Sequence, residues 1–210
     1  RIEAEGTVSL AADANPAVDM RATLDNMEMV RRSDLILAMD GTLTLMGPAL
    51  PASMEEPLRL EGELTTTTAR FNIPDQIGGG VPHIDVIEIQ GPDEEITEEA
   101  QETPPLPMLL DVTLKIGNSP AQVSGRGVNS LWTGSVTATG LAEDPALNGV
   151  LVAQRGTLDF AGKTFTLSSG SVSFAGEKPI DPLIDISLDY SRSDFSATVD
   201  ITGRGSSPNI

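Results

Sequence analysis

The chain has 210 residues, of which 39% are hydrophobic, and its 31 acidic and 13 basic side chains give a formal net charge of -18. Such a chain can bury a core, but its charge would repel a nucleic-acid backbone, which proteins bind through Lys and Arg. The absence of Cys excludes disulfides, thiolate metal sites and cysteine nucleophiles. No apolar run of about 18 residues is present, so no segment of this sequence is predicted to cross a bilayer as a helix.

The N-terminal half is predicted to consist of strands, because apolar and polar residues alternate with period two. Only five Phe, one Trp and one Tyr occur in the whole chain, so we expect an aliphatic interior. Residues 27–32 also fit a short helical turn, but we interpret them as strand. The other strands predicted in this half cover residues 7–11, 20–24, 35–39, 42–45, 58–64 and 69–73.

The middle of the chain is acidic and rich in proline. Residues 91–106 carry many carboxylates, which repel one another, and prolines, which block sheet pairing. We therefore predict a solvated loop or tether here. It divides the chain into an N-terminal β segment at 1–90, the loop at 91–106, and a C-terminal β segment at 107–210.

The C-terminal half shows the clearest alternation, at residues 111–116, 184–190 and 195–201. Shorter alternating stretches surround residues 158–160, 165–167 and 172–174. Turn signals are predicted at 140–145, 155–156, 161–163, 169–170 and 175–176, which favours successive antiparallel hairpins. Gly125 and Gly127 are interpreted as strand kinks or bulges. The whole chain would contain about fifteen strands.

One face of each predicted strand is apolar and the other is polar, which predicts an all-β fold. A long sheet with one apolar face must close, pair with another sheet or hold apolar material against that face. The alternation alone leaves open a half-open groove and a closed β-sandwich. The candidate inward residues are Val112, Leu114, Ile116, Leu158, Phe160, Phe165, Leu167, Val172, Phe174, Ile184, Ile186, Leu188, Val199 and Ile201.

Catalytic and metal-binding patterns are missing from the sequence. The single histidine, His83, cannot form a His-rich zinc site without Cys, and no nucleophile elbow accompanies the serines. Asp185, Asp189 and Asp200 could in principle form a glycosidase pair, but they occupy the polar phase of amphipathic strands. No calcium-loop, P-loop or dinucleotide motif occurs. We therefore predict a protein that is not an enzyme and that uses no catalytic residue, metal or cofactor.

An ordered series of glycine-aliphatic elements runs through residues 107–210. It includes Leu110-Asp111-Val112-Thr113-Leu114, Trp132-Thr133-Gly134-Ser135-Val136, Arg155-Gly156-Thr157-Leu158-Asp159-Phe160 and Gly170-Ser171-Val172-Ser173-Phe174, and ends at Pro182-Leu183-Ile184-Asp185-Ile186. This series resembles the C-terminal region of the TamB family, the translocation and assembly module subunit of Gram-negative bacteria. Residues 26–31, 41–47 and 69–74 fit the same family more loosely.

The resemblance implies an elongated antiparallel sheet rolled into a half-open hydrophobic groove, a β-taco. It further implies a periplasmic protein attached to the inner membrane by a helix outside this fragment. The expected partners are phospholipid and a TamA/BamA-like outer-membrane barrel. The expected function is to shield phospholipid acyl chains during transport between the membranes and so support outer-membrane biogenesis. Chaperoning of outer-membrane proteins by strand pairing and a purely structural strut are the alternatives.

Overall fold

The computed structural model describes residues 1–9, 17–48, 57–74 and 107–210, and within them every regular element is a β-strand. None of these residues belongs to a helix long and apolar enough to cross a membrane. The acidic segment at 91–106 and His83 lie outside the described residues. The strands are β1 (Ile2–Ser9), β2 (Ala17–Arg31), β3 (Leu35–Pro48), β4 (Leu58–Asn72), β5 (Met108–Gly125), β6 (Val128–Leu141), β7 (Ala146–Phe160), β8 (Lys163–Ala175), β9 (Leu183–Ser191), β10 (Ser196–Arg204) and β11 (Ser207–Asn209).

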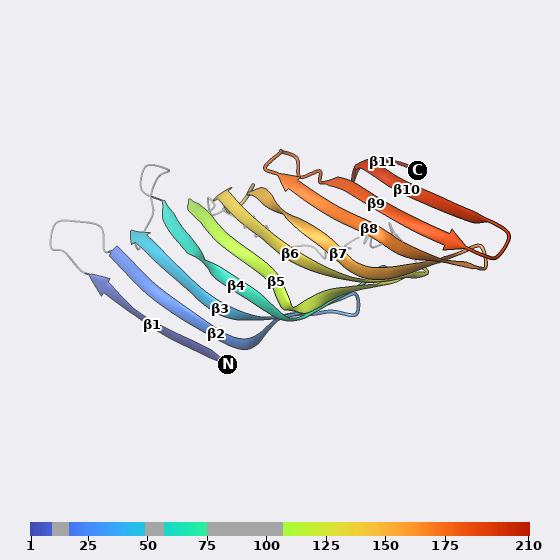
Figure 1. Cartoon of the computed structure of the whole chain (residues 1–210). Coiled ribbons are helices and arrows are strands. Elements are labelled where there is room, and N and C mark those ends of the chain that lie inside the picture. Colours follow the sequence, from blue (N-terminus) through green and yellow to red (C-terminus); the bar gives the residue numbers. More distant parts are fainter. Residues whose placement is uncertain (10–16, 49–56, 75–106) are drawn as a thin grey trace, which may run out of the picture.

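All of these strands belong to one sheet, in which they follow one another in chain order from β1 to β11 (Figure 1). Neighbouring strands pair antiparallel, as the hairpin signals predicted, except for β4 and β5, which are parallel. The parallel pair makes the sheet mixed, which corrects the expectation of a wholly antiparallel sheet. Parallel strands cannot be joined by a short hairpin turn, and β4 and β5 are accordingly far apart in sequence, at Leu58–Asn72 and Met108–Gly125.

The strands are fewer and longer than the sequence predicted. Residues 35–39 and 42–45 form the single strand β3, and residues 58–64 and 69–73 fall together on β4, which ends at Asn72. Residues 27–32 were correctly interpreted as strand, because β2 continues to Arg31. The turns predicted at 155–156 and 169–170 are wrong: these residues lie inside β7 and β8.

A row of register irregularities crosses the middle of the sheet and explains these errors. The shifts fall after Leu24 in β2, beside Thr67 in β4, after Ile116 in β5, at Gln154 in β7 and at Ser168 in β8. A β-bulge bends its strand and increases the local twist. Several bulges in line therefore bend the sheet along one crease, and the long strands β2–β5 visibly bend near their middles (Figure 1).

The bulges also explain how apolar residues of both odd and even number come to lie on the same face. In β8, Phe165 and Leu167 are odd-numbered, whereas Val172 and Phe174 are even-numbered, so simple alternation would put the two pairs on opposite faces. The extra residue at Ser168 shifts the phase, and pairing to β7 and β9 returns both pairs to one face. What looked like two short strands with a turn is one strand with a bulge.

The register separates the described strands into two faces of different composition. We call one side of the sheet the inner face. It contains Leu24, Gly41, Leu64, Leu114 and Val136, which pair across β2 to β6, and every second residue along each strand from these positions. At each bulge the extra residue shifts this alternation by one. The remaining paired residues form the outer face, which carries Asp, Glu, Arg, Lys and Thr. One face is therefore apolar and the other polar over all eleven strands.

The apolar face lies on the inside of the bend. Leu24, Met39 and Leu64 form a buried cluster beside the crease, and Leu37 and Leu43, which lie on opposite sides of the crease in β3, both pack against it. A flat single-layer sheet could not bury such side chains, so the two halves of each strand must close over them. No pair of non-neighbouring strands in the described part of the chain makes extensive contact. The closed β-sandwich is thereby excluded for these residues, and the sheet has the half-open, taco-like form.

Every glycine that pairs with a residue of a neighbouring described strand lies on the inner face. A Cβ on Gly62 would come within 2.2 Å of the Thr42 carbonyl oxygen, and its φ of +157° is one that other residues rarely adopt. Gly41 has the same relation to the carbonyl oxygen of Glu63. Removing side-chain bulk from the concave face lets neighbouring strands approach at the bend.

The Gly125–Gly127 segment is a hairpin turn. Arg126 and Gly127, which connect β5 to β6, have φ values of 53° and 84°. Positive φ at both central residues defines the two-residue turn that matches the twist of a β-hairpin. The interpretation of these glycines as strand kinks or bulges is therefore wrong.

Candidate functional site

The inner face forms continuous apolar rows that run across the strands, along the crease. Residues paired in successive strands place their side chains side by side on the same face. One row extends from β8 to β1 without interruption: Phe174, Gly149, Val136, Leu114, Leu64, Gly41, Leu24 and Ile2. A parallel row comprises Leu147, Ala138, Val112, Gly62, Leu43, Ala22 and Ala4.

All of the inward residues predicted from the sequence lie on this face. The pairing of β5 with β6, of β6 with β7 and of β7 with β8 places the predicted residues of β5, β7 and β8 on one face. Leu167 of β8 pairs with Leu188 of β9, which in turn pairs with Val199 of β10, so the residues of β9 and β10 share that face. Their exposure varies: Leu188 is 5% exposed, whereas Phe160, at the end of β7, is 67% exposed. The structure thus assembles them on one surface, and their role as lipid contacts belongs to the proposal below.

Sequence reasoning missed the N-terminal part of this surface and all of β6. The buried cluster of Leu24, Met39 and Leu64 lies next to bulges that break the alternation. In β6 the inward positions include Ser130, Gly134 and Ala138, which hide an otherwise regular period of two. Alternation read separately on each side of a suspected bulge would have found the first set, and counting small residues as inward positions would have found the second.

Two buried polar side chains interrupt the inner face beside the crease. Thr66 is 2% exposed and Ser130 is 7% exposed. The Ser130 hydroxyl oxygen accepts a hydrogen bond from Nε1 of Trp132 at 2.9 Å, and the Thr66 hydroxyl donates to the Ser119 carbonyl at 3.5 Å. Because both hydroxyls have partners, they add little polarity to the surface.

Lys163 is the one charged residue among the register-paired inner-face positions of the described strands, where it pairs with Phe160 at the β7–β8 hairpin. Its ammonium nitrogen lies 5.4 Å from the centre of the Tyr190 ring and 5.2 Å from that of Phe195. The Tyr190 ring centre is also 5.5 Å from that of Phe165. A cation and a group of aromatic rings therefore stand together at one rim of the inner face.

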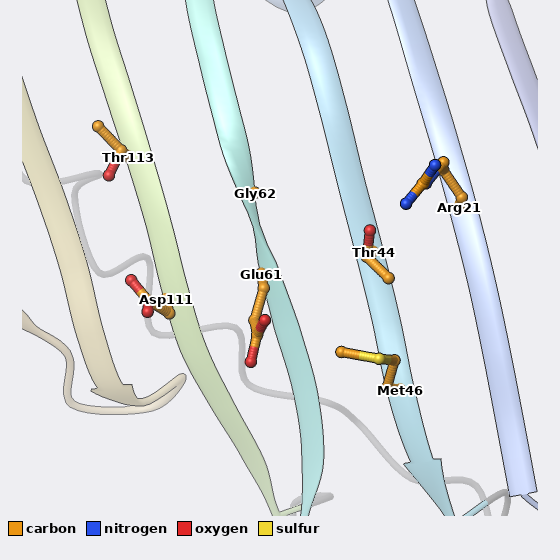
Figure 2. Close-up of a pocket in the computed structure, with 7 residues that line it drawn as sticks. All are labelled: Arg21, Thr44, Met46, Glu61, Gly62, Asp111 and Thr113. Atoms are coloured by element: carbon orange, nitrogen blue, oxygen red, sulfur yellow. The ribbon is translucent and has the colours of Figure 1, made fainter.

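The outer face offers no comparable apolar surface. An open depression of about 530 Å³ on this face, shown in Figure 2, is lined by Arg21, Thr44, Met46, Glu61, Gly62, Asp111 and Thr113. Glu61 and Asp111 are direct partners on parallel strands, so two carboxylates stand side by side. The depression is shallow and polar, and no group of three or more His, Cys, Asp or Glu suited to a metal occurs among the described residues.

The aspartates considered as catalytic candidates lie on the outer face and are engaged in hydrogen bonds between strands. Asp189 accepts a hydrogen bond from the Thr198 hydroxyl at 2.7 Å, and Asp200 accepts one from Ser187 at 2.6 Å. Asp185 pairs with Thr202 on the same face. Their arrangement is that of a solvated, cross-linked sheet surface.

A cluster of charged side chains joins the β8–β9 loop to the β10–β11 turn. Arg204 bonds to the Glu177 carboxylate, with one contact of 2.8 Å, and Asp181 accepts hydrogen bonds from the backbone and hydroxyl of Ser206. The Arg204 guanidinium lowers the pKa of Glu177, and the bonds from Ser206 lower the pKa of Asp181. Glu177 is exposed and Asp181 is half-buried, and neither lies on the apolar face, so these shifts concern attachment of the hairpin more than the core.

A single curved sheet with one continuous apolar face, and with no second layer among the described strands, defines a groove-forming, elongated β protein. Within that class, the chain belongs to the TamB family, since the model of the TamB C-terminal domain matches residues 1–210. The match extends over the N-terminal half, where the sequence resemblance was looser. A search of the curated proteins returned no match. Family membership identifies a TamB-like envelope protein, a component of transport and assembly in outer-membrane biogenesis.

At the level of the family, a periplasmic location and association with a TamA-like outer-membrane partner follow from this membership. Neither the cargo nor a membrane attachment follows from it.

Proposed function

We propose that the inner face shields phospholipid acyl chains during their passage between the inner and outer membranes. The observation that carries the proposal is the uninterrupted apolar row from Phe174 to Ile2, which crosses eight strands on the inside of the bend. The predicted inward residues, from Val112 to Ile201, form the C-terminal half of the same surface. A protein that buried this face in its own core would have a second layer, and the described strands have none.

The dimensions of the sheet suit acyl chains. A strand such as β3, with 14 residues, extends about 46 Å at roughly 3.3 Å per residue. Bent near its middle, it gives two walls of roughly 23 Å, which exceeds the roughly 15 Å hydrocarbon thickness of one leaflet. Eleven strands spaced about 4.8 Å apart make a trough about 48 Å long. Each wall is therefore deep enough to cover a fatty-acyl tail.

The chemistry of the face suits movement rather than tight binding. Burial of a methylene group contributes about 0.8 kcal/mol without requiring any particular orientation. Along a row of aliphatic side chains, a tail that leaves one strand meets an equivalent surface on the next. Because no polar contact has to break at each step, the barrier to sliding stays small.

In this proposal the complete protein is attached to the inner membrane by a helix outside the present sequence and meets a TamA/BamA-like barrel at the outer membrane. The groove then lies in the periplasm as one segment of a longer conduit. The polar outer face, with carboxylates such as Glu61 and Asp111, keeps such a conduit soluble.

Two adjacent residues of β7 provide a matched test. Leu151 lies on the inner face between Val172 and Gly134, whereas Val150 lies on the outer face between Ser173 and Ser135 and is 44% exposed. We expect the folded Leu151→Asp variant to lose co-purifying phospholipid and uptake from vesicles, and Val150→Asp to retain both. Native mass spectrometry with lipid extraction measures the bound lipid, and circular dichroism confirms folding. Wild-type protein that carries no lipid and takes none up would sink the proposal.

Strand pairing with unfolded outer-membrane proteins is a second candidate function, favoured by the open edge at β1. Within the described sheet β1 pairs only with β2, over Ile2–Ser9. The Arg1 carbonyl accepts a bond from the Asp25 N–H, so the even-numbered residues of β1 point their N–H groups away from β2. Ala4→Pro would therefore remove an outward donor and leave the β1–β2 ladder intact.

The edge variant separates the two functions. If the chain acts by strand pairing, Ala4→Pro should weaken binding of an extended barrel-strand peptide while Leu151→Asp leaves it unchanged. If the groove carries lipid, Leu151→Asp should reduce lipid uptake, whereas Ala4→Pro should leave it unchanged. Fluorescence anisotropy of a labelled peptide and lipid extraction, applied to both variants, give the comparison.

A further inference from the structure

The rim of the inner face at the β7–β8 hairpin differs chemically from the rest of that face. Elsewhere the register-paired inner positions of the described strands are apolar or small, with Thr66 and Ser130 as polar exceptions. Lys163 adds a full positive charge at the first residue of β8. It stands next to Phe160, which is 67% exposed, and near Phe195, which is 45% exposed.

The Lys163 ammonium makes no ion pair with a carboxylate in the described part of the chain. Asp159 lies on the outer face, where its carboxylate accepts a hydrogen bond from the Thr164 hydroxyl at 2.5 Å. The ammonium contacts the faces of Tyr190 and Phe195, an arrangement that holds a cation by its attraction to the ring electrons. In a chain with a net charge of -18, one cation is thus kept apart from carboxylates on the apolar face.

Aromatic rings beside a cation, next to aliphatic surface, make an amphipathic boundary. At membrane interfaces, Tyr rings such as that of Tyr190 lie at the level of the lipid headgroups, and a Lys side chain extends its charge to the polar side. Here the aliphatic side begins with Leu167 and Leu188, which pair across β8 and β9 on the inner face. A ligand that matches this boundary has an anionic head and an apolar tail.

We propose that Lys163, with the Phe160, Phe165, Tyr190 and Phe195 rings, forms a subsite for the phosphate of an anionic phospholipid whose acyl chain lies on the inner face. The subsite rests on the proposed function and assigns a headgroup position to it. Lys163 Nζ donates to the phosphate oxygens, and the rings cover the glycerol and the first methylenes. Phosphatidylcholine carries the same phosphate together with a choline cation, which the Lys163 ammonium repels, so the site favours a headgroup with a net negative charge.

The test uses short-chain phosphatidylglycerol and phosphatidylcholine, each below its critical micelle concentration, with binding followed by tryptophan fluorescence or isothermal titration calorimetry. Lys163→Gln should raise the Kd for phosphatidylglycerol roughly fivefold, the effect of losing one partly screened charge contact. The Kd for phosphatidylcholine should change much less, because the loss of the phosphate contact is offset by the loss of the repulsion between Lys163 and choline. Lys163→Arg should restore the binding of phosphatidylglycerol, because the guanidinium keeps the charge and stacks on rings.

Lys115→Gln is the matched control, since it removes the same charge from the outer face, where Lys115 pairs with Glu63 at 2.6 Å. It should leave both Kd values unchanged. An equal change for the two lipids with Lys163→Gln, or no change, would overturn the headgroup subsite while leaving the groove proposal standing. Wild-type protein that binds neither lipid would overturn both. Lys163-dependent binding to intact phosphatidylglycerol vesicles without binding of the monomeric lipid would overturn the subsite in favour of membrane docking.

Discussion

The inner and outer faces of this sheet are built from alternate residues of the same strands, yet they differ in almost every physical property. In β7, Leu151 is half-buried in an apolar row, and Val150, its neighbour in sequence, stands 44% exposed between two serines. Most buried apolar side chains are concentrated on one face, and most charged side chains on the other. The effect of a substitution should therefore depend on the face more than on the residue type.

The largest difference between the faces is expected at the crease. Leu24, 6% exposed, lies in the buried cluster, whereas Thr23 is exposed on the outer face between Glu3 and Thr42. Leu24→Lys should lower the free energy of unfolding by about 3 kcal/mol or more, because it buries an unpaired charge. Thr23→Lys should change it by less than about 0.5 kcal/mol. Urea denaturation followed by circular dichroism measures both, and equal effects would contradict the assignment of the faces.

The inner-face glycines should be the next most sensitive positions. Gly62→Ala would place a Cβ against the Thr42 carbonyl at a φ of +157°, and we expect a loss of about 2 kcal/mol. Gly117 is the control, since a Cβ there meets nothing within 4 Å. Gly117→Ala should be close to neutral. Thermal melts of the two variants give the comparison, and a stable Gly62→Ala protein would argue against close strand approach at the bend.

The sequence was enough to predict which residues of each short stretch face the apolar side. It was not enough to predict where a bulge shifts that alternation. Each run of alternation was correct locally, as at Val172 and Phe174, because side-chain direction depends only on neighbouring residues. A bulge depends on the partner strand, so Ser169-Gly170 looked like a turn although it lies inside β8. The parallel β4–β5 pair was also unpredictable, since pairing direction across a long connection leaves no mark on either strand.

Dependence on pH should belong to the outer face and the loops. The pKa values of Glu177 and Asp181 lie below their ordinary values of 4.5 and 3.8 in the folded chain. Their contribution to stability is therefore complete above those ordinary values and is lost as the pH falls through the lowered ones. Arg204→Gln should lower the Tm slightly at pH 7, and the difference from wild type should vanish in acid. A difference that grew in acid would contradict the assignment.

The smallest effect is expected for conservative polar replacement on the outer face. Val152 is 44% exposed and pairs with Thr133 and Ser171. Val152→Thr should change the free energy of unfolding by less than about 0.5 kcal/mol and leave lipid uptake intact. Leu151→Thr, which places the same residue on the inner face and also removes apolar volume, should reduce both. Similar results for the two variants would mean that the faces are less distinct than the register indicates.

The order of strands in this sheet has a consequence for how the molecule unfolds. Because extensive contacts join only neighbouring strands, the energetics resemble those of a linear array, in which each unit depends on the two beside it. Opening should begin at the short terminal strand β11 and at β1 and advance inwards, with β3–β6 exchanging their amide protons last. An array of this kind can lengthen or shorten by whole hairpins while its remaining units keep their stability, so its span becomes adjustable in evolution.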